Sequence, residues 1–161
     1  MLYRLLYHRH SYACKTGIGN ILIGAAAIAA DYNGVSSASH IREKLTEMIH
    51  LNETMFCYSL ACALESTPQS SGTYLVDPLL ANVCKLNVTR FPYEMARLAQ
   101  DLAGGLIVTL PSEKDLNDPK IGTYIQKYLQ GVEGVPTEDR LRILRLIENL
   151  TLGTGAVSYL T

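Results

Sequence analysis

Helical periodicity is the feature of this sequence that most restricts its fold. Apolar residues recur at three- and four-residue steps through most of the 161-residue chain, which places them on one face of each successive helix. The clearest stripe belongs to a helix predicted to run to about Leu64, and it consists of Ile41, Leu45, Met48, Asn52 and Met55. The pattern predicts an all-α protein whose helices pack as an antiparallel bundle.

Helix start signals divide the second half of the chain. Asp77 can cap a short helix whose first position is Pro78, because aspartate accepts hydrogen bonds from free backbone N–H groups and proline has none to lose. Thr137 is expected to cap the last helix in the same way. Loop signals concentrate between about residues 65 and 118. We therefore expect a single helical domain over residues 1–161 with this loop-rich section inside it.

Composition and charge exclude several classes of protein. With 14 basic and 15 acidic side chains, the chain lacks the positive field of a nucleic-acid-binding protein. It has no uninterrupted apolar run of about 18 residues, so no membrane span is predicted. No signal-peptide pattern follows the first residues. A cytoplasmic location is predicted, in which the four cysteines are thiols or ligands.

Two imidazoles, a phenol and a thiol lie close together near the amino terminus, at His8, His10, Tyr12 and Cys14. His10 and Cys14 are four residues apart, so on a helix they share one face. Iron–sulfur clusters take thiolate and sometimes imidazole ligands. The residues alone leave two interpretations open: a metal site, or a polar helix end with a buried cysteine.

A second polar group lies at helical spacing and consists of His50, Glu53, Thr54 and Cys57. A histidine–carboxylate pair could transfer a proton, but a solvated helix face explains the pattern better, and we assign no role to these residues.

Paired glycines form the third candidate. Gly104 and Gly105 would let the backbone approach a ligand closely, or they would simply end a helix. The apolar run Leu106–Leu110 that follows is predicted to be a brief strand or a buried segment.

Long runs of this sequence resemble the 4-hydroxybutyryl-CoA dehydratases, whose wider superfamily includes the flavin-dependent 4-hydroxyphenylacetate 3-monooxygenases. The runs are His8–Lys15, Leu22–Ala27, His50–Thr54, Tyr74–Lys85, Ala103–Lys114 and Gly155–Thr161. The resemblance covers nearly the whole chain and implies an acyl-CoA-dehydrogenase-like carboxy-terminal domain. It also implies a fragment from the carboxy-terminal half of a longer enzyme.

The resemblance implies conversion of 4-hydroxybutyryl-CoA to crotonyl-CoA through a ketyl-type radical, together with vinylacetyl-CoA isomerase activity. The implied cofactors are FAD and a 4Fe-4S cluster, both completed by residues outside this chain, so the fragment alone is expected to be inactive. The implied partners are an acyl-CoA substrate and further copies of the chain in a homotetramer. Two alternatives stay open: a flavin-dependent 4-hydroxyphenylacetate 3-monooxygenase-type domain, and a degenerate helical assembly domain without catalysis.

The resemblance also assigns site residues. Cys14 matches a cluster cysteine, His8 the cluster histidine, and Tyr12 a tyrosine near the substrate. The family places one more residue between this tyrosine and the cysteine, and His8 and Cys14 would lie about 120° apart on a regular helix. His10 is therefore a rival ligand. The segment with Gly104, Gly105, Pro111 and Ser112 matches a part of the superfamily close to flavin, often the flavin of a neighbouring subunit.

Overall fold

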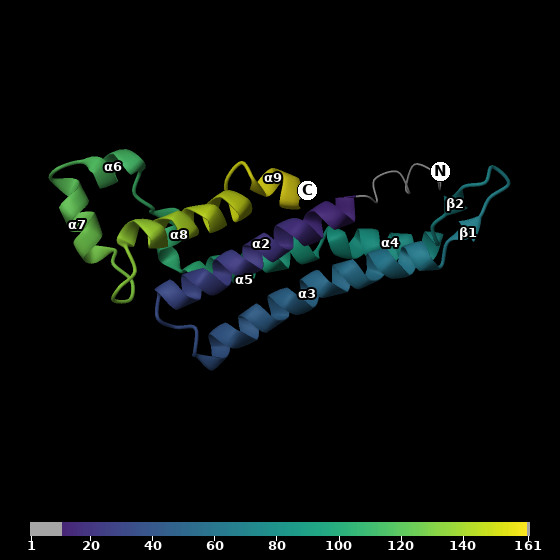
Figure 1. Ribbon diagram of the computed structural model, residues 1–161, viewed down its shortest axis with the longest axis horizontal. Helices are drawn as coiled ribbons and strands as arrows, with labels where there is room; N and C mark the ends of the chain where they lie inside the picture. Colours follow the sequence, from purple (N-terminus) through teal and green to yellow (C-terminus); the bar gives the residue numbers. More distant parts are fainter. Residues whose placement is uncertain (1–10, 161) are drawn as a thin grey trace.

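The computed structural model describes residues 11–160, with side chains from Cys14 onward. Its long helices, α2 (Ser11–Tyr32) and α3 (Ser39–Leu64), run antiparallel, and α5 (Phe91–Ala103) and α8 (Thr137–Thr151) pack against α2 (Figure 1). Helix α4 (Pro78–Val88) lies along α3. The prediction of an all-α antiparallel bundle is confirmed.

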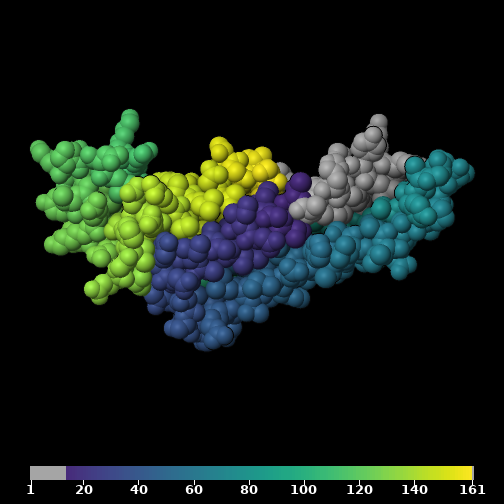
Figure 2. Space-filling view, in the orientation of Figure 1, coloured from purple at the N-terminus to yellow at the C-terminus, as the bar shows by residue number. Residues whose placement is uncertain are grey.

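The remaining elements are short. A two-stranded antiparallel hairpin joins α3 to α4, with Thr67 opposite Leu75, and it consists of β1 (Thr67–Pro68) and β2 (Tyr74–Leu75). The other short elements are the 3-10 turn η1 (Gly105–Val108), α6 (Glu113–Asn117), α7 (Ile121–Tyr128) and α9 (Ala156–Leu160). Figure 2 shows an elongated molecule in which α6 and α7 form one end and the hairpin the other. None of the described helices is long and apolar enough to cross a membrane.

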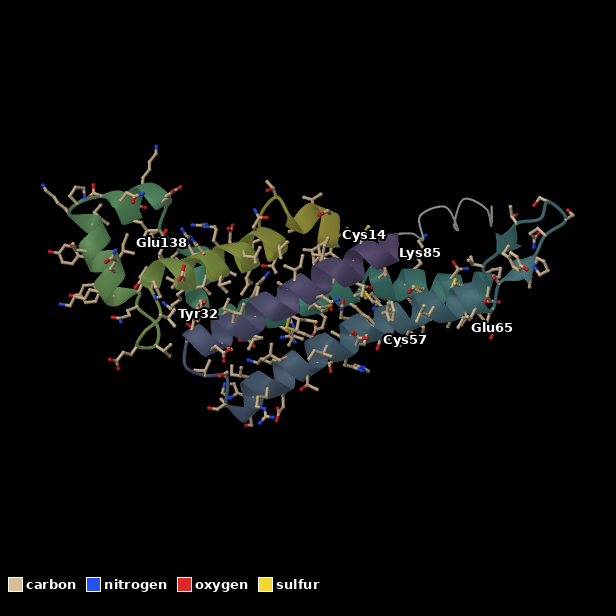
Figure 3. The ribbon with its side chains drawn as sticks, viewed as in Figure 1. Cys14, Tyr32, Cys57, Glu65, Lys85 and Glu138 are labelled. Atoms are coloured by element: carbon tan, nitrogen blue, oxygen red, sulfur yellow. The ribbon has the colours of Figure 1, made fainter. Side chains whose placement is uncertain are left out.

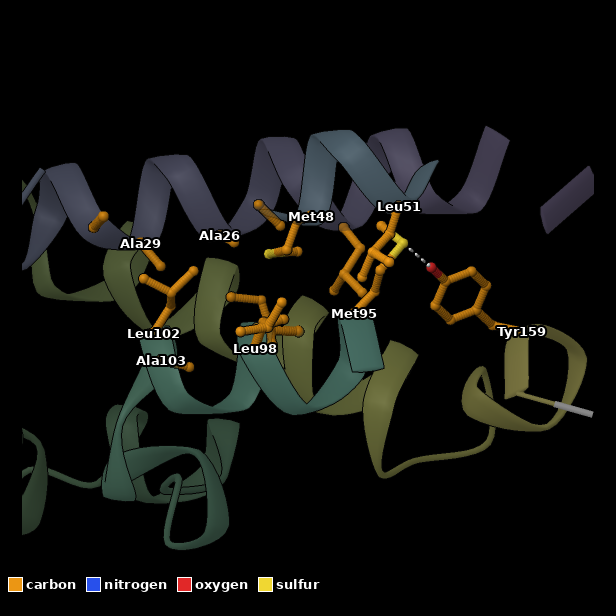
Figure 4. Close-up of a cluster of buried hydrophobic side chains, with 14 of the residues drawn as sticks. Ala26, Ala29, Met48, Leu51, Met95, Leu98, Leu102, Ala103 and Tyr159 are labelled. Carbon is orange, nitrogen blue, oxygen red and sulfur yellow. Dashed lines mark hydrogen bonds between the residues drawn. The ribbon is translucent and has the colours of Figure 1, made fainter. Parts of the chain in front are cut away.

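The core lies where α2, α3, α5 and α8 meet (Figure 4). Helix α2 contributes mainly small side chains, which let its neighbours approach closely, and the surrounding helices contribute the large ones. The predicted stripe on α3 is confirmed, because four of its five residues are buried and Leu45 packs against the core. The fully buried large side chains include Leu22, Met48, Met55, Met95, Leu144, Ile147 and Tyr159.

Two of the predicted helix boundaries are confirmed. Asp77 accepts a hydrogen bond from the backbone N–H of Leu80 at 2.7 Å, directly ahead of Pro78 in the first turn of α4. Gly104 ends α5 with a φ of 74°, a left-handed backbone conformation that glycine adopts without steric cost. Both local signals acted as the sequence indicated.

One other expectation about local structure is wrong, and for a second segment the structure decides between the two alternatives. Thr137 does not cap α8; its hydroxyl donates to the carbonyl of Gln126 at 3.1 Å and so ties α7 to α8. The run Leu106–Leu110 is not a strand, because its first part coils into η1 directly after Gly104. Ile107 is buried against the bundle, which agrees with the alternative of a buried segment. Tertiary contacts decided both outcomes.

The stability of the fold is expected to fall at alkaline pH through Tyr159. Its hydroxyl is buried and donates to the sulfur of Met95 at 3.1 Å (Figure 4), and burial raises the pKa of this phenol above its ordinary value. An unfolded tyrosine ionises near pH 10, whereas the folded one stays protonated. The contribution of Tyr159 to the free energy of unfolding is therefore fully present below that pH and decreases above it.

Urea unfolding at pH 8 and at pH 10.5 would measure this effect. Tyr159→Phe should lose less stability between the two pH values than the unchanged chain, because phenylalanine cannot ionise. Equal losses in the two proteins would contradict the prediction.

Candidate cofactor site

Cys14 lies in the first half of α2 near the carboxy-terminal end of α4 (Figure 3). Its thiol is free and exposed, whereas the thiols of Cys62 and Cys84 are buried. The interpretation of Cys14 as a buried core cysteine is therefore wrong. Because this sulfur is exposed, a metal ion can reach it, as a metal ligand requires.

The other residues predicted for the metal site cannot be placed. His8 and His10 lie outside the described residues, as does the side chain of Tyr12. Within the described part of the chain, no group of three or more His, Cys, Asp or Glu side chains is arranged to hold a metal ion. Cys14 thus fits one ligand of a cluster, and the assignments of His8, His10 and Tyr12 stay predictions.

Lys15 anchors the turn that carries Cys14. Its side chain is buried, and its ammonium donates to the backbone carbonyl of Val88 at the end of α4, at 3.3 Å. Burial lowers the pKa of this ammonium, since the charged form loses hydration. The contact joins segments 73 residues apart, so no local pattern in the sequence indicated it. It ties the start of α2 to α4.

The group at His50 faces outward. His50, Glu53 and Cys57 are exposed on α3, and the hydroxyl of Thr54 donates to the backbone carbonyl of His50 at 2.7 Å. Thr54 therefore bonds within its own helix. The interpretation as a solvated helix face is confirmed.

The segment predicted to approach flavin lies between α5 and α6. Gly104 and Gly105 are exposed, and no atom lies within 4 Å of a Cβ built at either position. Backbone is thus accessible to a ligand there. The N–H of Gly104 also donates to the carbonyl of Gln100, so the glycines end α5 as well.

Pro111 and Ser112 are held by hydrogen bonds. The carbonyl of Pro111 accepts from the guanidinium of Arg145 at 3.1 Å. Ser112 caps α6 through a reciprocal pair with Asp115, whose pKa these hydrogen bonds lower. Beside them lies an open cavity of about 280 Å³. Its lining residues are Pro111, Glu113, Leu116, Glu138, Leu141, Arg142 and Arg145.

The two candidate regions are not brought together within one chain. Figure 3 shows Cys14 and Glu138, which lines the cavity beside Pro111, well separated along the length of the bundle. This separation agrees with the expectation that the Gly104–Ser112 segment lies near the flavin of a neighbouring subunit.

The chain belongs to the family described as 4-hydroxyphenylacetate 3-hydroxylase C terminal, which matches residues 2–161. It is 52% identical over 96% of its length to the 4-hydroxybutyryl-CoA dehydratase/vinylacetyl-CoA-Delta-isomerase of Clostridium aminobutyricum. The structure of an oxygen-tolerant archaeal 4-hydroxybutyryl-CoA dehydratase from N. maritimus superposes with a TM-score of 0.94 at 61% identity, over 97% of this chain. The resemblance drawn from the sequence runs is confirmed.

More distant relatives are oxygenase components of 4-hydroxyphenylacetate 3-monooxygenases. The 4-hydroxyphenylacetate 3-monooxygenase oxygenase component of Thermus thermophilus is 28% identical over 89% of this chain. A structure of such a component, HpaB, complexed with FAD superposes over 94% of the chain with a TM-score of 0.83 and 26% identity. The chain spans about a third of the length of these proteins: 34% of the clostridial dehydratase and 32% of the HpaB chain.

Proposed function

We propose that this chain is the carboxy-terminal part of a flavin- and iron–sulfur-dependent dehydratase that acts on 4-hydroxybutyryl-CoA. The observation that carries the proposal is the contrast in identity, 52% and 61% with two dehydratases against 26% and 28% with the monooxygenase components. The fold is common to both groups, so the sequence similarity separates them. The product is crotonyl-CoA, and vinylacetyl-CoA is the substrate of the accompanying isomerisation.

The cofactors follow from the same relatives and from the chemistry of this chain. FAD is supported by the FAD complex of the HpaB relative, and the backbone at Gly104 and Gly105 is open to a ligand. A 4Fe-4S cluster is supported by the free, exposed thiol of Cys14. When bound, the two groups would supply the one-electron chemistry that makes an unactivated hydrogen removable.

The residues of this chain would then have separate tasks. Cys14 would hold iron, with His8 as the histidine ligand and His10 as its rival, and Tyr12 would lie near the substrate. The segment from Gly104 to Ser112 would border the flavin of a neighbouring subunit in a homotetramer. The separation of Cys14 from the cavity beside Pro111 supports this arrangement. A cytoplasmic location is part of the same proposal.

Purification of the full-length parent protein under anaerobic conditions tests the proposal. We expect turnover of 4-hydroxybutyryl-CoA to crotonyl-CoA, bound FAD, and about four irons and four sulfides per chain. The isolated 161-residue chain should show no turnover, because it spans only about a third of the relatives. Flavin without iron and hydroxylation of a phenol would instead establish a monooxygenase. A parent with neither cofactor would establish a helical assembly domain.

A further inference from the structure

One polar side chain lies in the middle of the apolar interface between α2 and α3. Asn52 is fully buried, and its amide nitrogen donates to the backbone carbonyl of Thr16 at 3.3 Å and to the side-chain oxygen of Asn20 at 2.7 Å. Because a backbone carbonyl can only accept, the nitrogen of the amide must face Thr16. The side-chain oxygen of Asn52 is buried and has no hydrogen-bond partner among the described residues.

The oxygen of Asn52 occupies a space that exists because α2 carries a glycine. A Cβ built at Gly19 would lie 2.1 Å from this oxygen, which is far inside van der Waals contact. The amide therefore fits a hole on α2 whose edges are Thr16, Gly19 and Asn20. Moving α2 by one turn, about 5.4 Å, could bring Ile23 to the place of Gly19. The amide would then lose its side-chain acceptor, because Gly24 would take the place of Asn20, and its oxygen would meet a branched side chain.

A buried amide that fits one position is a known way to fix how two helices align. In coiled coils, a single buried asparagine specifies the register at some cost in stability, because misaligned pairings leave it without partners. Asn52 resembles such an asparagine. Its amide nitrogen makes hydrogen bonds in the observed alignment, and its oxygen has room only beside Gly19. The apolar residues of the same stripe, such as Met48 and Met55, could pack in several alignments.

We propose that Asn52 is a positioning residue for Cys14, because it fixes the axial alignment of α2 on α3. Cys14 lies two residues before Thr16 on the same helix, so a shift of one turn would move its thiol by about 5.4 Å. A metal–ligand distance tolerates only about 0.2 Å. The importance of this positioning rests on the proposed role of Cys14 as a cluster ligand; the alignment itself does not depend on that role.

The two exposed cysteines allow the alignment to be measured. Cys14 on α2 and Cys57 on α3 are exposed, whereas Cys62 and Cys84 are buried, so nitroxide labels would attach to the first two in the 161-residue chain. Pulsed electron paramagnetic resonance then gives the distance between the helices. Asn52→Leu should broaden this distance distribution or shift it by about one turn, roughly 5 Å. Met55→Leu is the matched control and should leave the distribution narrow.

A second variant tests the same contact from α2. Gly19→Ala should disturb the label distance as Asn52→Leu does, because its Cβ would overlap the oxygen of Asn52. Gly24→Ala on the same helix has open space around its Cβ and should change nothing. An unchanged distance distribution in Asn52→Leu or in folded Gly19→Ala would overturn the proposal.

Iron analysis of the full-length parent separates the alignment from the proposed function. Asn52→Leu should lower the iron content and change the cluster spectrum, while Met55→Leu keeps both, even if the two variants unfold at the same temperature. Equal iron content in the two variants would overturn the positioning role. If the full-length parent without any substitution contains no iron, the cluster is removed from the proposed function. The label distances would still decide whether Asn52 fixes the alignment.

Discussion

Replacing Cys14 by alanine in the full-length parent protein is expected to remove its iron while leaving its flavin bound. Cys14 is the one cluster ligand proposed for this chain whose side chain the structure describes, and its thiol is exposed. Alanine offers iron no ligand. Cys14 lies on α2, whereas the Gly104–Ser112 segment lies between α5 and α6, so the replacement leaves that segment intact and the flavin should stay bound. Dehydratase turnover should fall more than about 100-fold, since even the loss of an outer partner costs roughly 10–100-fold.

Cys57→Ala is the matched control for this experiment. Cys57 is also a free, exposed thiol, but it lies on the outward face of α3 and has no proposed role. Colorimetric iron and sulfide assays and visible spectra of both variants would decide the outcome. Full iron content in Cys14→Ala would refute the ligand role, and equal iron loss in both variants would indicate a general sensitivity to cysteine replacement.

The largest expected effect on stability comes from Leu144→Ala. Leu144 on α8 is completely buried in the shared core of the bundle. Removing its branched end leaves a cavity, and leucine-to-alanine changes at such positions cost about 2–5 kcal/mol of unfolding free energy. A domain of this size has only about 5–15 kcal/mol in total. We therefore expect a marginally stable chain.

Leu146→Ala provides the comparison within the same helix. Leu146 lies two residues further on and is 38% exposed, so its truncation removes less buried surface and should cost less than about 1 kcal/mol. Urea unfolding followed by circular dichroism gives both values. Similar losses for the two variants would show that the core is not centred where α8 meets α2 and α5.

The sequence predicted those parts of the fold that depend on local or periodic signals. The stripe on α3 and the start of α4 at Asp77 were predicted correctly because helical spacing and capping act within a few residues. Thr137 was assigned wrongly because Gln126, 11 residues away, competes for its hydroxyl. Asn52 was counted as one member of an apolar stripe, since its complement Gly19 lies on another helix.

The candidate site likewise has features that the sequence indicated and features that it did not. Runs such as His8–Lys15 were sufficient to indicate the family, because long matched segments are specific. They did not indicate that Cys14 is exposed or that Lys15 bonds to Val88 across 73 residues. They also could not show that Pro111 borders a cavity distant from Cys14. Such relations arise only when the chain is folded, because they join residues from different helices.

Cys14 and the Pro111 cavity lie well apart along the bundle, and this separation has a consequence for the effect of dilution on activity. In the proposed assembly, each chain would supply residues to two different catalytic centres and complete neither of them alone. Dissociation would then abolish turnover without unfolding a single helix. Specific activity would depend on protein concentration, with loss and recovery that follow the equilibrium between subunits.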